Sequence, residues 1–256
     1  SPIKFFPNKL AWAFAPGHAA LRKCPDYSSL RSFVNEQATA GNMTRQEAVS
    51  MVPPLVLDVQ PHHRVLDMCA APGSKTTQMM EMILSGDAPP TGFLIANDVN
   101  IKRAFTLLTQ CKRMSTDRLL VSKHDARQFP VLVPGTRVDG TRYFPGTFDR
   151  ILADVPCSGD GTLRKNVDLW SSWSPGLAIN VHKTQITIAQ KGILHLKPGG
   201  LMVYSTCSFN PIEDEAVVAE LLRSNLGTLE LVDCADKLPE LVRRAGVPSW
   251  VVYGKD

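Results

Sequence analysis

Two cysteines lie in short polar motifs that suit covalent chemistry. Cys157 stands within Asp154-Val-Pro-Cys-Ser-Gly-Asp-Gly161, and Cys207 stands within Ser205-Thr-Cys-Ser208. A cysteine in a protein core behaves as a small hydrophobic residue and is expected among Leu and Val. Polar or small residues flank both of these cysteines instead. We therefore interpret them as candidate reactive thiols, since the thiolate is the nucleophilic form of cysteine.

Four acidic residues each follow or end a short apolar run, and they form the second chemical pattern: Asp67, Asp98, Asp125 and Asp154. A single aspartate at such a place is more often the cap of a turn or helix than part of a site. Four of them at successive run ends are harder to explain by capping. We expect at least some of these carboxylates to bind a ligand.

The elements that must position these residues alternate between β-like runs and helical stretches. Five runs are predicted as strands: Arg64–Cys69, Gly92–Asp98, Leu119–Lys123, Phe148–Val155 and Gly200–Thr206. Between them, helical spacing i, i+3, i+4, i+7 predicts a buried face made of Ile101, Ala104, Phe105 and Leu108, and Asn210-Pro-x-Glu213 predicts another helix start. Alternating strands and helices favour an α/β fold with a mainly parallel sheet.

In such a sheet, ligands bind beyond the carboxyl ends of the strands. The first run leads into Asp67-Met-Cys-Ala-Ala-Pro-Gly-Ser-Lys75, which has one glycine where a dinucleotide fingerprint has three. This difference argues against a nucleotide-dependent oxidoreductase. Asp98 ends the second run, where a carboxylate can accept hydrogen bonds from both ribose hydroxyls. An adenosine-bearing cofactor without a diphosphate is S-adenosylmethionine, which we predict as the cofactor.

Thiols are needed for only some methyl transfers. Carbon 5 of a pyrimidine is a poor nucleophile, so the ring must first be activated by addition of a thiolate to carbon 6, with an acid group supporting N3. Carbon 5 then takes the methyl group, a base removes its proton, and the thiolate leaves. Cys157 stands after the Asp-Val-Pro sequence, where amino-group methylases place an aromatic residue. The two cysteines therefore favour methylation at carbon 5.

The N-terminal residues differ from the rest. We predict residues 1–52 as a mixed, mainly helical appendage and residues 53–256 as the catalytic domain. Thr44-Arg-Gln-Glu47 fits a capping box that opens a short helix, which Pro53-Pro54 would stop. Residues 131–147 read as a long surface loop or hairpin, and Leu229–Val232 and Trp250–Tyr253 are late strand candidates.

Several longer motifs resemble the Nop/Sun family of RNA 5-methylcytosine methyltransferases, closest to its eukaryotic tRNA (cytosine-5) methyltransferase branch. They are CAAPGSKT (69–76), DVPCSGDGT (154–162) and YSTCS (204–208), with RQEAVSMVPPL (45–55) and NPIEDEAVVAELL (210–222) extending the resemblance over nearly the whole chain. The resemblance implies a Rossmann-like class I S-adenosylmethionine-dependent methyltransferase sheet with flanking helices and a small N-terminal appendage. The implied activity is methylation of RNA, with tRNA as the expected substrate.

The resemblance also implies a role for each matching residue. Cys207 would be the nucleophile, Cys157 would help to resolve the adduct, and Lys75 would orient Asp154 or the base. Asp98 would hold the ribose, Asp125 the adenine edge, and Asp154 would face both cofactor and base. The methionine and ribose end of the cofactor would be lined by Cys69, Ala70, Ala71, Pro72, Gly73, Ser74 and Lys75.

Charge is unevenly placed along the chain. The 28 basic and 24 acidic residues give a net charge of +4, but residues 1–200 carry 23 Lys and Arg against 15 Asp and Glu. A basic body suggests a polyanionic partner, and a merely solvated surface explains the charge equally well. Three basic pairs are candidate phosphate contacts or simply solvated helix faces: Lys102-Arg103, Lys112-Arg113 and Arg164-Lys165. Fuller family members carry more RNA-binding sequence, so we expect weak RNA binding by this core.

The composition argues against several other classes of protein. Six cysteines without a C-x-x-C pair argue against a disulfide-stapled fold and against a zinc site, so no metal is expected. The apolar runs fall far short of the length that a membrane span needs. We expect an intracellular monomer, nuclear or nucleolar by the resemblance. The remaining alternative is a non-catalytic RNA-binding scaffold that retains the fold, although degenerate members would be expected to lose a cysteine or a cofactor aspartate.

Overall fold

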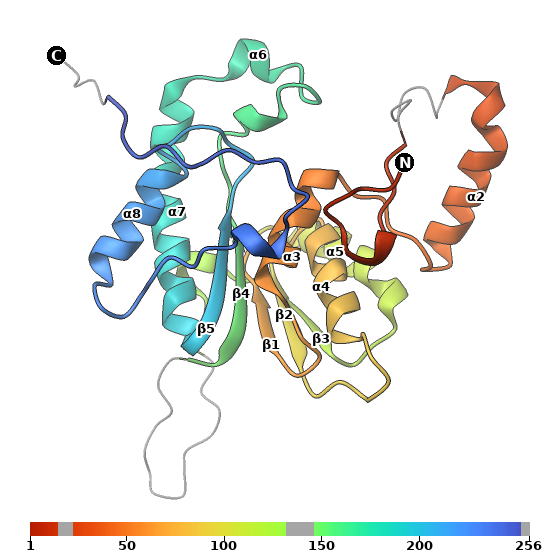
Figure 1. Cartoon of the computed structure of the whole chain (residues 1–256), viewed down its shortest axis with the longest axis horizontal. Coiled ribbons are helices and arrows are strands. Elements are labelled where there is room, and N and C mark those ends of the chain that lie inside the picture. The colour runs from red at the N-terminus through yellow and green to blue at the C-terminus, as the bar shows by residue number, and fades with distance from the viewer. Residues whose placement is uncertain (15–22, 132–145, 252–256) are drawn as a thin grey trace, which may run out of the picture.

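The computed structural model describes residues 1–14, 23–131 and 146–251. Its centre is a five-stranded sheet in which every neighbouring pair is parallel, in the order β3-β2-β1-β4-β5 (Figure 1). The strands are β1 (Arg64–Asp67), β2 (Phe93–Asn97), β3 (Leu119–Ser122), β4 (Phe148–Asp154) and β5 (Leu196–Ser205). All five predicted strands are confirmed, and β5 begins four residues before the predicted Gly200.

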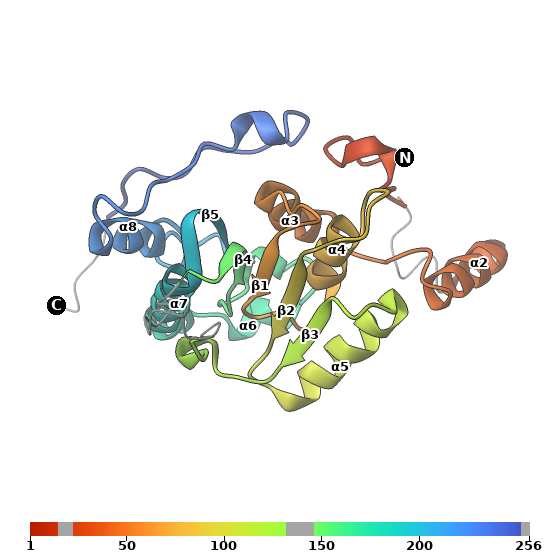
Figure 2. The same ribbon diagram turned by 90° about the horizontal axis from the view of Figure 1, so that it is seen from below.

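Helices pack against both faces of the sheet. The α-helices of the described residues are α2 (Ser28–Thr39), α3 (Val52–Leu57), α4 (Ser74–Ile83), α5 (Ile101–Cys111), α6 (Leu169–Ser172), α7 (Pro175–His195) and α8 (Glu215–Ser224). Figure 2 shows α3 and α4 on one side of the sheet and α7 on the other. Helix α2 lies apart from the sheet in both views and buries none of its residues. The arrangement is a doubly wound α/β fold, as the alternating pattern predicted.

Two hydrophobic layers hold the sheet between its helices. Successive strand residues point to opposite faces, so Val65 packs in the layer shared with α3, α4 and α5, whereas Leu66 packs in the layer shared with α7. Leu152 and Ile151 of β4 divide in the same way, and all four side chains are fully buried. Each such side chain contributes about 1.5–3 kcal/mol through burial, so the central strands are held from both sides.

The buried face of α5 differs from the predicted one. Three of the four predicted residues are half-exposed or more: Ile101, Phe105 and Leu108. Ala104 is buried as predicted, and the other buried residues of the helix are Leu107 and Cys111. The physical reason is a close approach to the loop before α4, where a Cβ on Gly73 would lie 2.9 Å from Leu107 Cδ1. Spacing alone could not choose between two apolar stripes on one helix.

The predicted capping box at Thr44–Glu47 is wrong. The Thr44 hydroxyl accepts a hydrogen bond from Arg113, and the first helical turn, Ala48–Met51, begins after Glu47 without a side-chain cap. Pro53 and Pro54 do not stop a helix, because they lie in the first turn of α3. A proline is tolerated there since its missing N–H would have had no partner within the helix.

The C-terminal part also departs from the predictions. Residues 210–214 form a hydrogen-bonded turn, and α8 begins only at Glu215. The predicted strand at Leu229–Val232 is wrong. Of the predicted strand Trp250–Tyr253, residues 250 and 251 do not form a strand, and residues 252 and 253 lie outside the described residues. Residues 132–145 of the predicted loop also lie outside the described residues. Within the described ranges, no helix has the length and apolar character needed to cross a membrane.

Candidate active site

The candidate site lies where the strand order reverses. From β1 the chain moves outward to β2 and β3 and then returns to the other side of β1 as β4 and β5. The crevice beyond the carboxyl ends of the strands at such a switch point is the usual ligand site of an open α/β sheet. Asp67 ends β1 and Asp154 ends β4, so two predicted acidic positions lie at this crevice.

Asp154 is held by two neighbours. Lys75, the second residue of α4, places its Nζ 2.7 Å from Asp154 Oδ2, and Ser205 Oγ donates to Asp154 Oδ1 at 2.7 Å. Ser205 pairs directly with Asp154 in the register of β4 and β5. The Lys75 and Asp154 side chains remain partly exposed, so this ion pair faces the crevice. The predicted proximity of Lys75 and Asp154 is thus present in the structure.

The two cysteines lie side by side beyond the same strands. Cys157 Sγ is 3.1 Å from Cys207 Sγ, and the Cys207 backbone N–H donates to Cys157 Sγ at 3.3 Å. The residues are 50 positions apart in sequence, and they meet because β4 and β5 are parallel neighbours that end in register. Cys207 is exposed, whereas Cys157 is only partly so. The exposed thiol is therefore the one that an incoming base can reach.

Electrostatics separates the roles of the two thiols. A hydrogen bond from the Cys157 S–H lowers the pKa of Cys207 to about 7, against burial and the charge of Asp154, and with help from Lys165 and Lys75. The same contact, together with burial, raises the pKa of Cys157. Cys207 is therefore the more acidic of the two thiols, and a large fraction of it is ionised near neutral pH, which suits the nucleophile role predicted for it.

The loop between β1 and α4 carries the predicted cofactor residues. Gly73 is the N-cap of α4 with φ +112°, a conformation that suits glycine. The first amides of α4 point toward the crevice end of the helix, where unpaired N–H groups favour a polar or anionic ligand group. Burial strongly raises the pKa of Cys69, which disfavours its thiolate form. Ala70 and Ala71 are buried and Pro72 is exposed.

The two outer aspartates have different surroundings. Asp98 is almost fully buried and accepts hydrogen bonds from the N–H groups of Ala71 and Asn100, at 3.3 and 2.9 Å. Arg103 lies 3.4 Å from the same carboxylate. Asp125 instead caps its own turn and binds Arg127 at 2.6 Å, which lowers the pKa of Asp125. The structure therefore brings Asp98, but not the carboxylate of Asp125, into contact with the loop before α4.

Asp67 is one of the four candidate aspartates, and the sequence assigned it no particular role, but its surroundings suit ligand binding. Thr76 Oγ1 donates to Asp67 Oδ2 at 2.7 Å, while the other oxygen is buried without a partner among the described residues. Burial raises the pKa of Asp67 to about 7. A buried polar oxygen usually has a partner, so an incoming hydrogen-bond donor beside α4 suits it. Its position at the end of the first predicted strand was the sequence feature that could have identified it as a site residue.

Three further polar residues connect the cysteine loops and were also missed: Asp160, Gln185 and Glu213. Asp160 accepts from the Phe209 N–H at 2.8 Å, and Gln185 Nε2 donates to the Pro156 carbonyl at 3.0 Å. Glu213 was predicted only as a helix-start residue, yet it is fully buried. None of these three could be found from local sequence, because each binds a segment distant in the chain.

The three basic pairs differ in availability. Arg113 is committed to structure, since its guanidinium binds the Gly41 carbonyl, Thr44 and Glu81. Lys165 pairs with Glu47, and Arg103 binds Asp98. The other basic residue of each sequence pair has an exposed side chain, namely Lys102, Lys112 and Arg164. These three lysine and arginine side chains remain candidates for phosphate contacts.

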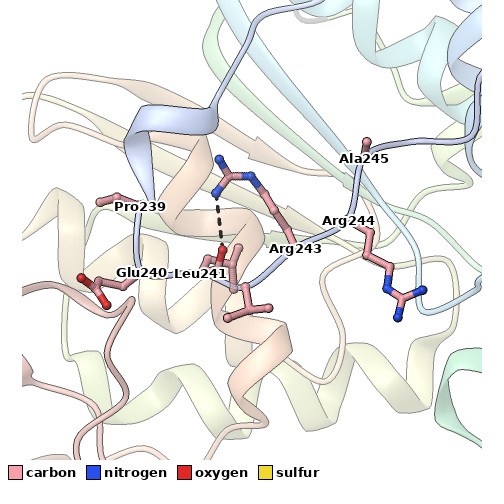
Figure 3. A pocket seen from close by; sticks show the side chains of 7 residues that line it. Pro239, Glu240, Leu241, Arg243, Arg244 and Ala245 are labelled. Carbon is pink, nitrogen blue, oxygen red and sulfur yellow. Dashed lines mark hydrogen bonds between the residues drawn. The ribbon is translucent and has the colours of Figure 1, made fainter.

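Two cavities lie away from the predicted residues. One of about 650 Å³ is lined by residues 239–245 alone, and Figure 3 shows Arg243 folded back so that its guanidinium donates to the Leu241 carbonyl. Another of about 420 Å³ is lined by residues 4–9 and 237–240. Neither is lined by a predicted site residue.

The sheet, its switch point and the acidic residues at the strand ends define a Rossmann-like methyltransferase domain. The crystal structure of NSun6 from Pyrococcus horikoshii is similar, with a TM-score of 0.61 and 26% sequence identity over 74% of this chain and 40% of that chain. Residues 54–239 match the family described as 16S rRNA methyltransferase RsmB/F, and the chain belongs to this family.

Curated relatives agree with this assignment. The chain is 46% identical to the multisite-specific tRNA:(cytosine-C(5))-methyltransferase of Saccharomyces cerevisiae, over 99% of this chain and 37% of the relative. It is 45% identical to the tRNA (cytosine(34)-C(5))-methyltransferase of Drosophila melanogaster, over 99% of this chain and 34% of the relative. The predicted resemblance to the eukaryotic tRNA branch is confirmed, and the chain spans about a third of the length of these relatives.

Proposed function

We propose that this chain is the catalytic domain of an S-adenosylmethionine-dependent RNA cytosine-5 methyltransferase that acts on tRNA. The observation that carries the proposal is the contact of 3.1 Å between Cys157 and Cys207 beside Asp154. A paired thiol and thiolate at the carboxyl end of a methyltransferase sheet suits activation of carbon 5 of a pyrimidine. The names of the yeast and fly relatives, both tRNA cytosine-C(5) methyltransferases, support the same substrate.

The reaction proceeds through covalent activation of the base. The Cys207 thiolate forms a bond to carbon 6, and the electron pair of the ring double bond moves toward carbon 5, while Asp154 faces the base. The cofactor, when bound, supplies the methyl group that carbon 5 takes. A base then removes the carbon 5 proton, the double bond reforms, and the bond between carbon 6 and Cys207 breaks. Cys157 assists this last stage, and Lys75 holds Asp154 in place through the 2.7 Å ion pair.

The cofactor would lie along the loop before α4. Asp98, Asp67 and the first amides of α4 offer acceptors and donors for its ribose and methionine ends, alongside residues 69–75. Asp125 would reach the adenine edge from its capped turn. This arrangement places Asp154 between the cofactor and the cysteine pair. Its carboxylate would therefore face the space in which the target base must lie.

The target cytosine must leave its stack to reach Cys207. Phosphates flanking it would meet the exposed basic residues Lys102, Lys112 and Arg164. RNA affinity should therefore fall as salt rises, with a slope set by the number of neutralised phosphates. We also propose that residues 1–52 form an appendage to the catalytic domain at 53–256, and that the protein is intracellular, in the nucleus or nucleolus.

The test is transfer of a labelled methyl group from the cofactor to total tRNA, followed by mapping of 5-methylcytosine. Cys207→Ala serves as the control, because it removes the nucleophile and should leave cofactor binding intact. Label at carbon 5 of cytosine that depends on Cys207 supports the proposal. Cofactor binding without transfer would identify the scaffold alternative instead.

A further inference from the structure

A buried carboxylate that the reaction does not use lies between the two cysteine loops. Glu213 is fully buried, and its side chain accepts hydrogen bonds from both loops and from α7. It stands in the turn before α8, and the Tyr204 hydroxyl donates to its backbone carbonyl at 2.6 Å. The carboxylate is therefore placed by its own backbone anchor and not by the loops alone.

Each cysteine has a neighbour that donates to this carboxylate. Ser158, which follows Cys157, donates its N–H to Glu213 Oε2 at 2.8 Å and its hydroxyl to Oε1 at 2.5 Å. Ser208, which follows Cys207, donates its hydroxyl to Oε1 at 2.8 Å. Both loops thus meet at the Oε1 atom of Glu213.

Gln185 adds a second hold on the first loop. Its Nε2 donates to Glu213 Oε2 at 2.9 Å and to the carbonyl of Pro156 at 3.0 Å. Cys157 is consequently fixed through the residue before it and the residue after it. Hydrogen bonds to Ser158, Ser208 and Gln185 lower the pKa of Glu213 although burial opposes this. An ionised carboxylate, which accepts at both oxygens and donates at neither, is the group that matches four donors.

We propose that Glu213 is a positioning residue that sets the contact between Cys157 and Cys207 by tying their loops to one carboxylate. The inference rests on the proposed function only in taking Cys207 as the reactive thiol. The S–H of Cys157 can act on Cys207 only while the sulfur atoms stay close, since a hydrogen bond weakens steeply with distance and misalignment. The other charged groups that act on Cys207, namely Asp154, Lys75 and Lys165, do not bind Glu213.

The test measures the acidity of Cys207 without RNA or cofactor. The rate of alkylation by iodoacetamide is followed against pH, and mass spectrometry reports the Cys207 peptide separately from the other five cysteines. In Glu213→Gln, the amide would direct N–H groups at the donors of Ser158, Ser208 or Gln185 and so separate the loops. We expect the midpoint to move up from about 7 by about one pH unit, with alkylation at pH 7 slowed about fivefold because the thiolate fraction falls from about one half to about one tenth.

Glu215→Gln is the matched control. Glu215 is a carboxylate two residues further along and accepts a hydrogen bond from the Val247 N–H instead of from a cysteine loop. Its variant should retain the wild-type midpoint. Glu213→Asp keeps the charge on a shorter side chain and should give an intermediate midpoint. A purely structural Glu213 would lower the melting temperature without moving the midpoint, and that result in folded Glu213→Gln would overturn the inference.

A second pair of variants covers the case in which Glu213→Gln does not fold. Ser158→Ala and Ser208→Ala each remove a donor while the buried carboxylate keeps its remaining partners. Both should raise the Cys207 midpoint, and wild-type midpoints in both would overturn the inference. Because the assay contains no RNA, its failure leaves the methylation experiment standing, and absence of methylation leaves the alkylation result standing.

Discussion

Replacing Cys157 by alanine tests the two stages at which this thiol acts. The change removes the S–H group that lies 3.1 Å from Cys207 and that is the largest of the influences, with Lys165 and Lys75, that lower the pKa of Cys207 from 9.0 to about 7. A shift of two units corresponds to about 2.7 kcal/mol. Because Cys207 is exposed, solvent screens part of this interaction. We therefore expect about half of it, a rise of about one pKa unit. The thiolate fraction at pH 7 then falls from about one half to about one tenth, which slows the attack about fivefold.

The second effect of Cys157→Ala appears after attack. Without Cys157, release of Cys207 from carbon 6 should stall, so a covalent protein–RNA adduct should accumulate and survive denaturing electrophoresis. The adduct should form slowly at pH 7 and faster near pH 9, where Cys207 ionises without help. Denaturing gels of reactions with tRNA and cofactor at both pH values measure these rates. The double variant with Cys207→Ala is the control and should give no adduct.

Three results would refute this reasoning. Adducts in Cys207→Ala and none in Cys157→Ala would show that the nucleophile is Cys157. Loss of stability in both variants, with no adduct in either, would show that the two thiols serve only in packing. An adduct that forms equally fast at pH 7 and pH 9 would show that Cys157 does not control the acidity of Cys207.

Three further predictions follow from the same crevice. Asp98→Ala should lose charge-assisted bonds of about 1.5–3 kcal/mol and weaken S-adenosylmethionine binding by tens of fold, and unchanged affinity in calorimetry would exclude the ribose role. Burial raises the pKa of Asp67 from 3.8 to about 7, so ionisation of Asp67 opposes folding. The free energy of unfolding should therefore fall as pH rises from about 4 to 7. Urea unfolding of Asp67→Asn should show no such fall. In Gly161→Ala, the Cβ would lie 2.6 Å from the Cys207 carbonyl oxygen. We expect the free energy of unfolding to fall by about 1–3 kcal/mol in denaturant unfolding and alkylation of Cys207 to become slower. Wild-type values of both would show that the two loops move apart without cost.

The sequence by itself determined the sheet and the candidate chemistry. Continuous apolar runs predict strands buried on both faces, and the observed strands fall within these runs apart from the early start of β5. The polar residues at the run ends could also be predicted, because parallel strands bring their carboxyl ends to one edge. Cys157, Cys207 and Asp154 were thus assigned to one place without any knowledge of their distances.

Only the tertiary structure decided which side chains are bound to one another. Helix α5 carries apolar residues on two sides, and its packing beside Gly73 determines that Leu107 is buried while Phe105 is exposed. Arg113 could bind phosphate as far as its local sequence shows, but the N-terminal segment occupies its guanidinium. Glu213 follows a helix-start pattern, yet its carboxylate binds partners 55 and 28 residues away. Such contacts depend on how distant segments pack, because hydrogen-bond partners are selected by distance and direction in space and not by spacing along the chain.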